Sequence, residues 1–598
     1  MNGARRTAIS VSVAAWVATI ASVASAQVKM DDVLKDALTV GDVVTIGLGP
    51  QGQRFSPISL ANRETVSRIV PGWSLPLGGD NRSGSGDQPQ AHVLSLSEGQ
   101  PLVRDGIMYV SGSLSGVEAV DTKSGRRIWH YDHRPADRAR FCCDAPNRGA
   151  ALFADKIYLS TRDAKLVALN AKTGKVVWMH DIDDLKSGHA EISAPLIVPS
   201  KAHGPIVVTG MARGEFGVVG RVDARRADTG ARVWSRPTIE GHLGELAGKP
   251  ATMTGKLESG LPDEMWTRRG GATWLGGTYD PETKLIFVGT GAPAPSTAPP
   301  SANDRKWSRA RIAIDPETGT IRWGFQTTPN EGWNYDGVNE LVAFDMGGQK
   351  VAATADRNGF FYVLDRASGR FISAFPFVSR INWAKGIDKS GRPVAEPEWG
   401  GQTWVGSTGK TSIVPGPFGG KNWMPMAYSR DTKLFYVPSN EWGQAASGGR
   451  GSRINGLPAS PTPVFDTHVG SLKAIDPTSG QVVWEYKDTG PLWGGVLATA
   501  GGLVVFGTAQ GELKALDALT GEPLWSRKTG GSIVSSPITW VQDGEQMFAV
   551  VSSPAGSGPL AAGQVTAATT NRGQSQPPAA GPVLWTFRLP KEIPSTSN

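Results

Sequence analysis

A nine-residue phrase, D-x-x-[TS]-G-x-x-x-W, recurs along the chain and constrains its fold more than any other feature. Six copies end in Trp, two of them with Asn or Arg in place of the Asp, and they begin at Asp121, Asn170, Arg226, Asp315, Asp476 and Asp517. A degenerate copy, DRASGRFIS from Asp365, lacks the Trp. We interpret each copy as a hairpin. Its Thr/Ser-Gly pair makes the turn, and its second strand carries a Trp that packs between sheets.

The hairpins predict an all-β protein. Units repeated at intervals of tens of residues indicate stacked four-stranded sheets, and radial closure into a ring protects the edges of such sheets. The 75 glycines and 42 prolines among the 598 residues indicate many turns. A last strand candidate, Val583–Leu589, can pair with strands near the mature N-terminus. Seven copies plus this closing unit predict an eight-bladed β-propeller with Trp-docking repeats.

The first 26 residues have the features of a cleaved export signal. Arg5 and Arg6 precede an apolar stretch over 7–23, and Ala24-Ser25-Ala26 is a small-residue cleavage site. The stretch is barely long enough for the alternative, a membrane anchor. We therefore expect 1–26 to be a signal peptide and 27–598 to form a single propeller in the periplasm. That propeller has no membrane span and has a flexible excursion at about 555–581, where large apolar residues are few.

Several function classes are disfavoured by pattern. The net charge of +7 is scattered, and no Lys/Arg run follows the signal, so nucleic acid is not expected as a partner. Residues 47–52 match G-x-G-x-x-G, but Pro50 and the lack of a following amphipathic helix argue against a nucleotide site. The eight histidines form no metal-binding pattern. Asp31–Leu38 is expected to be a short helix outside the propeller.

Cys142 and Cys143 are the only cysteines, and they are neighbours. They match neither a haem-attachment motif nor a zinc site. In an oxidising compartment they either pair with each other or remain two buried free thiols, and export favours the disulfide. Such a disulfide is strained, and strain of that kind is typical of functional sites.

Phe141-Cys142-Cys143-Asp144, followed by Asn147-Arg148-Gly149 and combined with the repeats, resembles the soluble quinoprotein alcohol dehydrogenases of the methanol and ethanol dehydrogenase type. The resemblance runs from near Arg54 to about Pro554. It implies pyrroloquinoline quinone (PQQ) on the propeller axis, between a Trp and a vicinal disulfide. The residues carried over by motif as cofactor contacts are Glu98, Cys142, Cys143, Arg148, Trp274, Arg357, Asn422 and Trp493. Among them Trp274 would stack on the cofactor, Arg148 would meet a carboxylate, and Arg357 would face the quinone oxygens.

The same resemblance implies a Ca²⁺ or lanthanide ion, a hard cation that requires oxygen ligands. Glu215 matches the family's ligating Glu, and Asp336 matches an Asp that binds the metal in lanthanide-type members. Ala292 stands where the family has a ligating Asn, and alanine offers no side-chain oxygen. Asn334 stands where the family has its catalytic Asp, and a carboxamide cannot accept the substrate's proton. Ile192 similarly replaces an expected Thr.

The resemblance therefore implies a periplasmic PQQ-dependent dehydrogenase. It would oxidise an alcohol or hydroxylated compound by hydride transfer to PQQ and pass the electrons to a cytochrome c. Asp336, Asn334 and Arg357 are the candidate catalytic residues, with Glu215 and Asp336 as the metal ligands. One alternative is a PQQ-binding propeller with little or no turnover, because of Ala292 and Asn334. Another is a scaffold propeller of the outer-membrane assembly sort, against which the adjacent cysteines and the ordered motifs argue.

Overall fold

In the computed structural model of the chain, the described residues are 27–77, 97–112, 116–133, 147–183, 190–214, 218–239, 270–292, 306–329, 335–396, 412–445, 453–454, 457–458, 461–554 and 581–591. The expected signal peptide lies outside them, as does nearly all of the excursion expected at about 555–581. Within the described part, no helix is long and apolar enough to cross a membrane.

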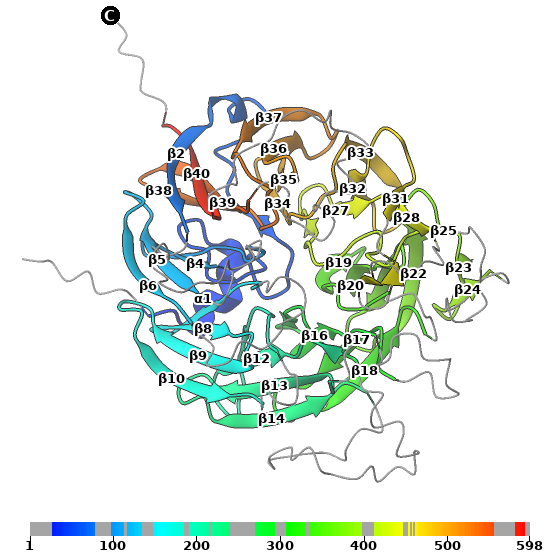
Figure 1. The fold of residues 1–598 in the computed structure, drawn as a ribbon, viewed down its shortest axis with the longest axis horizontal. Helices are drawn as coiled ribbons and strands as arrows, with labels where there is room; N and C mark the ends of the chain where they lie inside the picture. Colours follow the sequence, from blue (N-terminus) through cyan, green and yellow to red (C-terminus); the bar gives the residue numbers. More distant parts are fainter. Residues whose placement is uncertain are drawn as a thin grey trace, which may run out of the picture.

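Eight four-stranded antiparallel units are arranged around a central axis as the blades of a β-propeller (Figure 1). The strands of blades 1 to 3 are β3 (Leu102–Arg104), β4 (Ile107–Ser111), β5 (Val117–Asp121), β6 (Arg127–Tyr131); β7 (Ala151–Phe153), β8 (Lys156–Ser160), β9 (Lys165–Asn170), β10 (Val176–Asp181); and β11 (Leu196–Val198), β12 (Ile206–Gly210), β13 (Arg221–Arg226), β14 (Arg232–Pro237). Those of blades 4 and 5 are β15 (Thr278–Asp280), β16 (Leu285–Gly289), β17 (Ala310–Ile314), β18 (Ile321–Gln326); and β19 (Val342–Met346), β20 (Gln349–Ala355), β21 (Phe360–Asp365), β22 (Phe371–Pro376). Those of blades 6 and 7 are β26 (Ala427–Tyr428), β27 (Phe435–Asn440), β32 (Gly470–Ile475), β33 (Val482–Asp488); and β34 (Val496–Thr499), β35 (Leu503–Gly507), β36 (Glu512–Asp517), β37 (Pro523–Lys528). The predicted all-β class and blade number are confirmed.

Blade 8 combines the two ends of the chain. Its strands β38 (Ile538–Gln542), β39 (Glu545–Ser552) and β40 (Val583–Leu589) come from the C-terminal region, and β2 (Val70–Pro76) adds the outer strand by pairing antiparallel with β40. The predicted closure of the ring through Val583–Leu589 is confirmed. Short strands outside the blades are β23 (Ala384–Ile387), β24 (Pro393–Ala395), β25 (Ser412–Ile413), β28 (Trp442–Ala445), β29 (Arg453–Ile454), β30 (Leu457–Pro458) and β31 (Pro461–Pro463).

Each repeat Trp lies on the outermost strand of its blade, where it docks onto the next blade. The indole N–H groups of five repeat Trp residues and of Trp73 donate to backbone carbonyls of that neighbour over 2.8–3.2 Å, in the pairs Trp73–Thr122, Trp129–Ala171, Trp178–Asp228, Trp234–Pro316, Trp484–Ala518 and Trp525–Ile69. The bond satisfies the one polar atom of a large apolar ring. The indole N–H of Trp323 has no hydrogen-bond partner among the described residues. Trp73, on β2, was not recognised from the sequence because it lies outside the repeat.

The repeat Gly contacts the Trp of the preceding blade. Gly319 has φ +70°, and a Cβ added there would lie 2.7 Å from the ring of Trp234. The Gly is thus required twice, for the left-handed turn and for the close approach of the ring. In the degenerate copy, Phe375 replaces the missing Trp: it lies on β22 and packs against Gly480.

The N-terminal segment lines the axis from within. It contains α1 (Met30–Lys35), a 3-10 turn at Asp36–Leu38, β1 (Phe55–Ser56) and a second 3-10 turn at Val66–Arg68; α1 lies over the centre of the ring in Figure 1. The carbonyls of residues 50, 51, 53 and 54 accept, in order, from the innermost strands of blades 4 to 7, at Tyr279, Ala343, Tyr428 and Ala498. β1 also pairs in parallel with β34. The predicted short helix exists, and residues 47–52 form turns of this axial segment.

Arg54 fixes this segment to the first blade and to the last two blades of the ring. Its buried guanidinium donates to the carbonyls of Val496 (2.7 Å) and Pro537 (3.1 Å), to that of Ile46 (2.8 Å) and to the side chain of Gln100. Burial lowers its pKa to about 9. A fully desolvated cation is tolerated here because its donors are satisfied by protein oxygens.

Gly319→Ala should destabilise the fold by roughly 1–3 kcal/mol more than Gly204→Ala, because the added methyl meets the ring of Trp234. Gly204 is the matched control: its φ is +69°, and an added Cβ would meet nothing within 4 Å. Both variants share the cost of alanine in the left-handed region. Urea unfolding of both variants measures the difference, and equal free energies of unfolding would contradict the ring contact.

Candidate functional site

Most of the predicted site residues lie in loops that lead into the innermost strand of a blade. Each stands a few residues before that strand, in the pairs Glu98–β3, Arg148–β7, Trp274–β15, Asp336–β19, Asn422–β26 and Trp493–β34. Arg357 and Ala292 lie between the second and third strands of blades 5 and 4. Because strand direction alternates within a blade, both kinds of loop open at the same end of the propeller. Residues from six blades therefore meet around one end of the axis.

The indole of Trp274 is the centre of this group. The guanidinium carbon of Arg148 lies 4.6 Å from the ring centroid, and that of Arg357 lies 5.4 Å from it. The indole N–H donates to Oδ2 of Asp336 over 3.1 Å. Two guanidinium groups close to one indole form a positively charged aromatic surrounding suited to a planar anion.

Glu98 and Arg148 form a buried ion pair between blades 1 and 2. Oε2 of Glu98 lies 2.9 Å from Nη2 of Arg148. Burial raises the pKa of Glu98 and lowers that of Arg148, and the neighbouring charge of Arg357 lowers the latter further. Nε and Nη1 of Arg148 are buried and have no hydrogen-bond partner among the described residues. Such unsatisfied donors on a buried cation indicate a place for an anionic ligand.

Arg357 is held by the loop before β26. Its Nη2 donates to Oδ1 of Asn422 over 3.2 Å, and its carbonyl accepts from the N–H of Gly420 over 3.0 Å. Gly419 (φ +78°) packs against its Cα and Cβ so closely that an added methyl would lie 2.5 Å away. Two residues predicted separately, Arg357 and Asn422, are thus in direct contact.

Trp493 belongs to a cluster of aromatic rings beside this loop. It stacks on Trp423 with centroids 4.7 Å apart and planes 7° from parallel, and its centroid lies 5.3 Å from that of Trp442. The indole N–H groups of Trp493 and Trp423 are buried without a hydrogen-bond partner in the described part of the chain. Trp442 was missed by sequence reasoning. Trp423 directly follows the predicted Asn422 in the sequence, and this neighbour was the signal available there.

Asp336 is fixed at both oxygens. Oδ1 accepts from the backbone N–H of Ala292 over 2.6 Å, Oδ2 accepts from Trp274, and Nη1 of Arg357 lies 3.6 Å from Oδ2. Position 292 therefore contributes only backbone. The other predicted residues Glu215, Asn334, Cys142 and Cys143 lie outside the described residues. Among the described residues, no group of three or more His, Cys, Asp or Glu is placed to hold a metal ion.

Two neighbours on the loop before β11 complete the surroundings. Ile192 packs against the apolar cluster that contains Trp274, Trp423 and Trp493. Its carbonyl accepts from the N–H of Arg148 over 3.2 Å. Glu191 is fully buried and accepts from Oγ1 of Thr209 over 3.1 Å. Burial and the nearby Asp223 raise the pKa of Glu191 to about 8. Sequence reasoning missed Glu191, because nothing in the local pattern marks it as buried.

Fold and site together define a class: propellers that bind a planar anionic ligand across one end of the axis. A family model described as glucose/ethanol/alcohol dehydrogenase, beta-propeller domain (PQQ), matches residues 45–379, and one for the outer membrane protein assembly factor BamB matches 468–593. The quinoprotein alcohol dehydrogenase PedH of Pseudomonas putida is 44% identical over 612 residues, covering 99% of each chain. A quinoprotein ethanol dehydrogenase of Pseudomonas putida is 42% identical, covering 94% of this chain and 93% of that one.

Among solved structures, a europium-containing methanol dehydrogenase superposes with a TM-score of 0.78 at 32% identity, covering 93% of this chain and 100% of that one. The chain belongs to the PQQ-dependent glucose/ethanol/alcohol dehydrogenase family. The resemblance inferred from the cysteine and Trp motifs is confirmed at this level.

Glu191→Gln should change how stability depends on pH. A carboxyl whose folded-state pKa is raised from 4.5 to about 8 stabilises the fold fully at low pH, and this contribution is lost as pH rises through that interval. Gln removes the titration. Relative to the variant, the wild type should lose at most about 1.4 kcal/mol of unfolding free energy per pH unit. Parallel slopes in urea unfolding at pH 5.0, 6.5 and 8.0 would contradict this assignment.

Proposed function

We propose that this protein is a periplasmic PQQ-dependent dehydrogenase that oxidises a primary or secondary alcohol, or a larger hydroxylated compound. The observation that carries the proposal is the pair of guanidinium groups over Trp274, with buried donors of Arg148 left unsatisfied. Its relatives named as alcohol and ethanol dehydrogenases support the reaction type. Electrons would leave to a separate cytochrome c, since the sequence contains no C-x-x-C-H motif.

The described residues fit PQQ, a planar quinone that carries carboxylates. Trp274 offers the stacking face, and Arg148 offers Nε and Nη1 as two separate donors to anionic oxygens of the ligand. Arg357, oriented by Asn422, faces the same ring, and Trp493 supplies an indole N–H. When bound, PQQ supplies the two-electron oxidant that takes hydride from the alcohol carbon. The expected partner on the opposite face is the Cys142–Cys143 disulfide.

We propose that Asp336 and Glu215 hold a Ca²⁺ or lanthanide ion beside the quinone. Asp336 fits this role: each oxygen of an ionised carboxylate has two lone pairs, and each here accepts one hydrogen bond from the described residues, which leaves capacity for a cation. Ala292 contributes no side-chain oxygen, so water would complete the coordination shell. The europium in the related methanol dehydrogenase structure supports a lanthanide.

The substrate's hydroxyl proton needs an acceptor, and Asn334 is neutral. Either Asp336 or Glu215 would take it while also binding the cation. The second candidate function follows from positions 292 and 334. With Ala292 and Asn334 in place of the family's Asn and Asp, the propeller would bind PQQ with little or no turnover.

Titration of the mature protein with PQQ, with and without Ca²⁺ or La³⁺, tests the proposal through the absorbance of the bound quinone. We expect stoichiometric binding and alcohol-dependent dye reduction over a panel of alcohols. Arg148→Lys keeps the positive charge but loses the planar set of guanidinium N–H donors. It should weaken PQQ binding by about tenfold to a hundredfold. Binding without turnover would favour the second candidate, and no binding would refute both.

Variants at Glu215 and Asn334 test metal binding and proton acceptance separately. Glu215→Gln should weaken Ca²⁺ or La³⁺ binding by at least about tenfold, measured by calorimetry on the PQQ-loaded protein. Asn334→Asp should keep or raise dye reduction with either ion, because it restores a carboxylate base. Unchanged metal affinity would rule out Glu215 as a ligand. Loss of activity in Asn334→Asp would show that Asn334 has a role of its own.

A further inference from the structure

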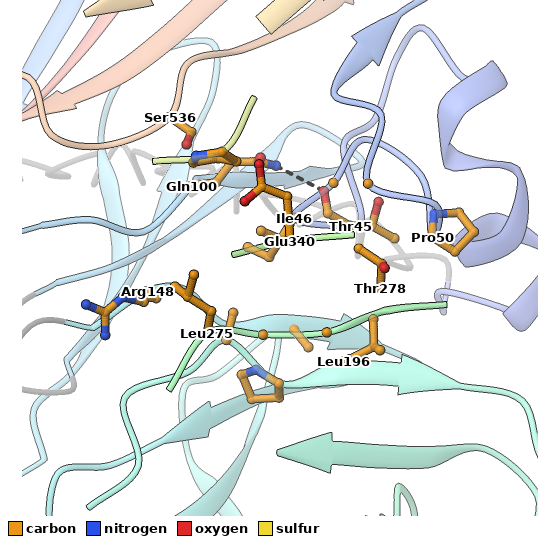
Figure 2. Close-up of a pocket in the computed structure, with 18 of the residues that line it drawn as sticks. Thr45, Ile46, Pro50, Gln100, Arg148, Leu196, Leu275, Thr278, Glu340 and Ser536 are labelled. Carbon is orange, nitrogen blue, oxygen red and sulfur yellow. Dashed lines mark hydrogen bonds between the residues drawn. The ribbon is translucent and has the colours of Figure 1, made fainter. Parts of the chain in front are cut away.

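A cavity of about 140 Å³ lies inside the ring next to the candidate site, with which it shares part of its wall (Figure 2). Its wall comes from the N-terminal segment and from seven of the eight blades, each contributing residues near the start of its innermost strand. Glu98, Arg148 and Trp423 are in the wall, whereas the described lining does not include Trp274 or Asp336. In Figure 2 the guanidinium group of Arg148 points away from the other labelled residues.

The wall is mainly apolar. Typical contributors are Ile46 from the N-terminal segment, Ala151 and Leu152 of blade 2, Ala194 and Leu196 of blade 3, and Val534 of blade 8. In Figure 2, Leu196 and Leu275 lie on one side, and Gln100, Glu340 and Ser536 lie on the other. Three polar side chains of the wall therefore lie opposite these two leucines.

Two of those polar side chains direct their hydrogen bonds into the protein. Gln100 accepts from Arg54 through Oε1 and donates through Nε2 to the carbonyl of Thr45 over 3.0 Å. Glu340 accepts at Oε1 from the N–H of Met426 over 2.9 Å, and its Oε2 lies 2.8 Å from Nζ of the fully buried Lys421. Arg54 also lines the cavity, and its donors are used as described above. A buried water needs two to four polar partners, and these committed groups are poor candidates.

We propose that this axial cavity is a binding site for one small, neutral, apolar molecule of about six heavy atoms. A cavity of about 150 Å³ with aliphatic and aromatic walls stays dry and binds benzene or xenon in another protein, so the size is sufficient. An occupant would contact the inner side of Glu98, Arg148 and Trp423, groups that the cofactor site also uses. The proposal does not rest on dehydrogenase activity.

Xenon and benzene are the probes, because neither can react as a substrate. In xenon-pressurised crystals of the PQQ-free chain, we expect an anomalous peak within the cavity. Benzene should raise Tm in a concentration-dependent manner by binding the folded state. Two cavity-filling variants, Ala151→Leu and Ala194→Leu, should each abolish this rise. Ala202→Leu is the matched control, since Ala202 is exposed on a loop of blade 3, and it should keep the full rise.

Ordered waters filling the cavity, or the absence of both the xenon peak and the Tm rise, would overturn the proposal. So would a Tm rise that persists in both filled variants. If one variant fails to fold, the other still decides. PQQ titration of the same proteins is read separately: a chain that binds xenon but not PQQ would refute the proposed function and leave the cavity assignment intact.

Discussion

The pairing of β2 with β40 is the constraint on which the rest of the structure depends. The sheet of each blade packs face to face with those of its two neighbours, so the ring closes only if the last blade meets the first. β2 comes from residues 70–76, and its three partner strands come from the C-terminal region. Trp73 on β2 docks onto blade 1, while Trp525 of blade 7 docks onto Ile69, just before β2. One strand therefore joins blade 8 to both of its neighbours.

Closure makes the axis a place where otherwise distant residues must meet. The loops that precede innermost strands carry one or two functional residues each, and none of them forms a site alone. Buried cations are costly unless paired, and here Arg148 pairs with Glu98 while Arg357 lies beside Asp336 and Asn422. Because Arg148 keeps unsatisfied donors after this pairing, the site is suited to an anion rather than to a neutral ring.

The N-terminal segment fills the axis and makes it part of the packed core. Its backbone carbonyls accept from the innermost strands of four consecutive blades, and Arg54 adds contacts to blades 1, 7 and 8. This segment forms part of the wall of the axial cavity. Ring, segment and site are thus one continuous packing arrangement in the described part of the chain.

The sequence by itself determined the fold class, the number of blades and the closing strand, and it predicted a set of site residues. It could determine the fold because hairpin signals are local and recur in order, whereas the site residues that the motifs name remain predictions. Only the tertiary structure decided how these parts meet. Gly319 touches Trp234 of the preceding blade, and Phe375 replaces a missing Trp, because blades stack across the ring. Likewise, burial of Glu191 and the axial cavity arise from elements far apart in sequence, which no local pattern encodes.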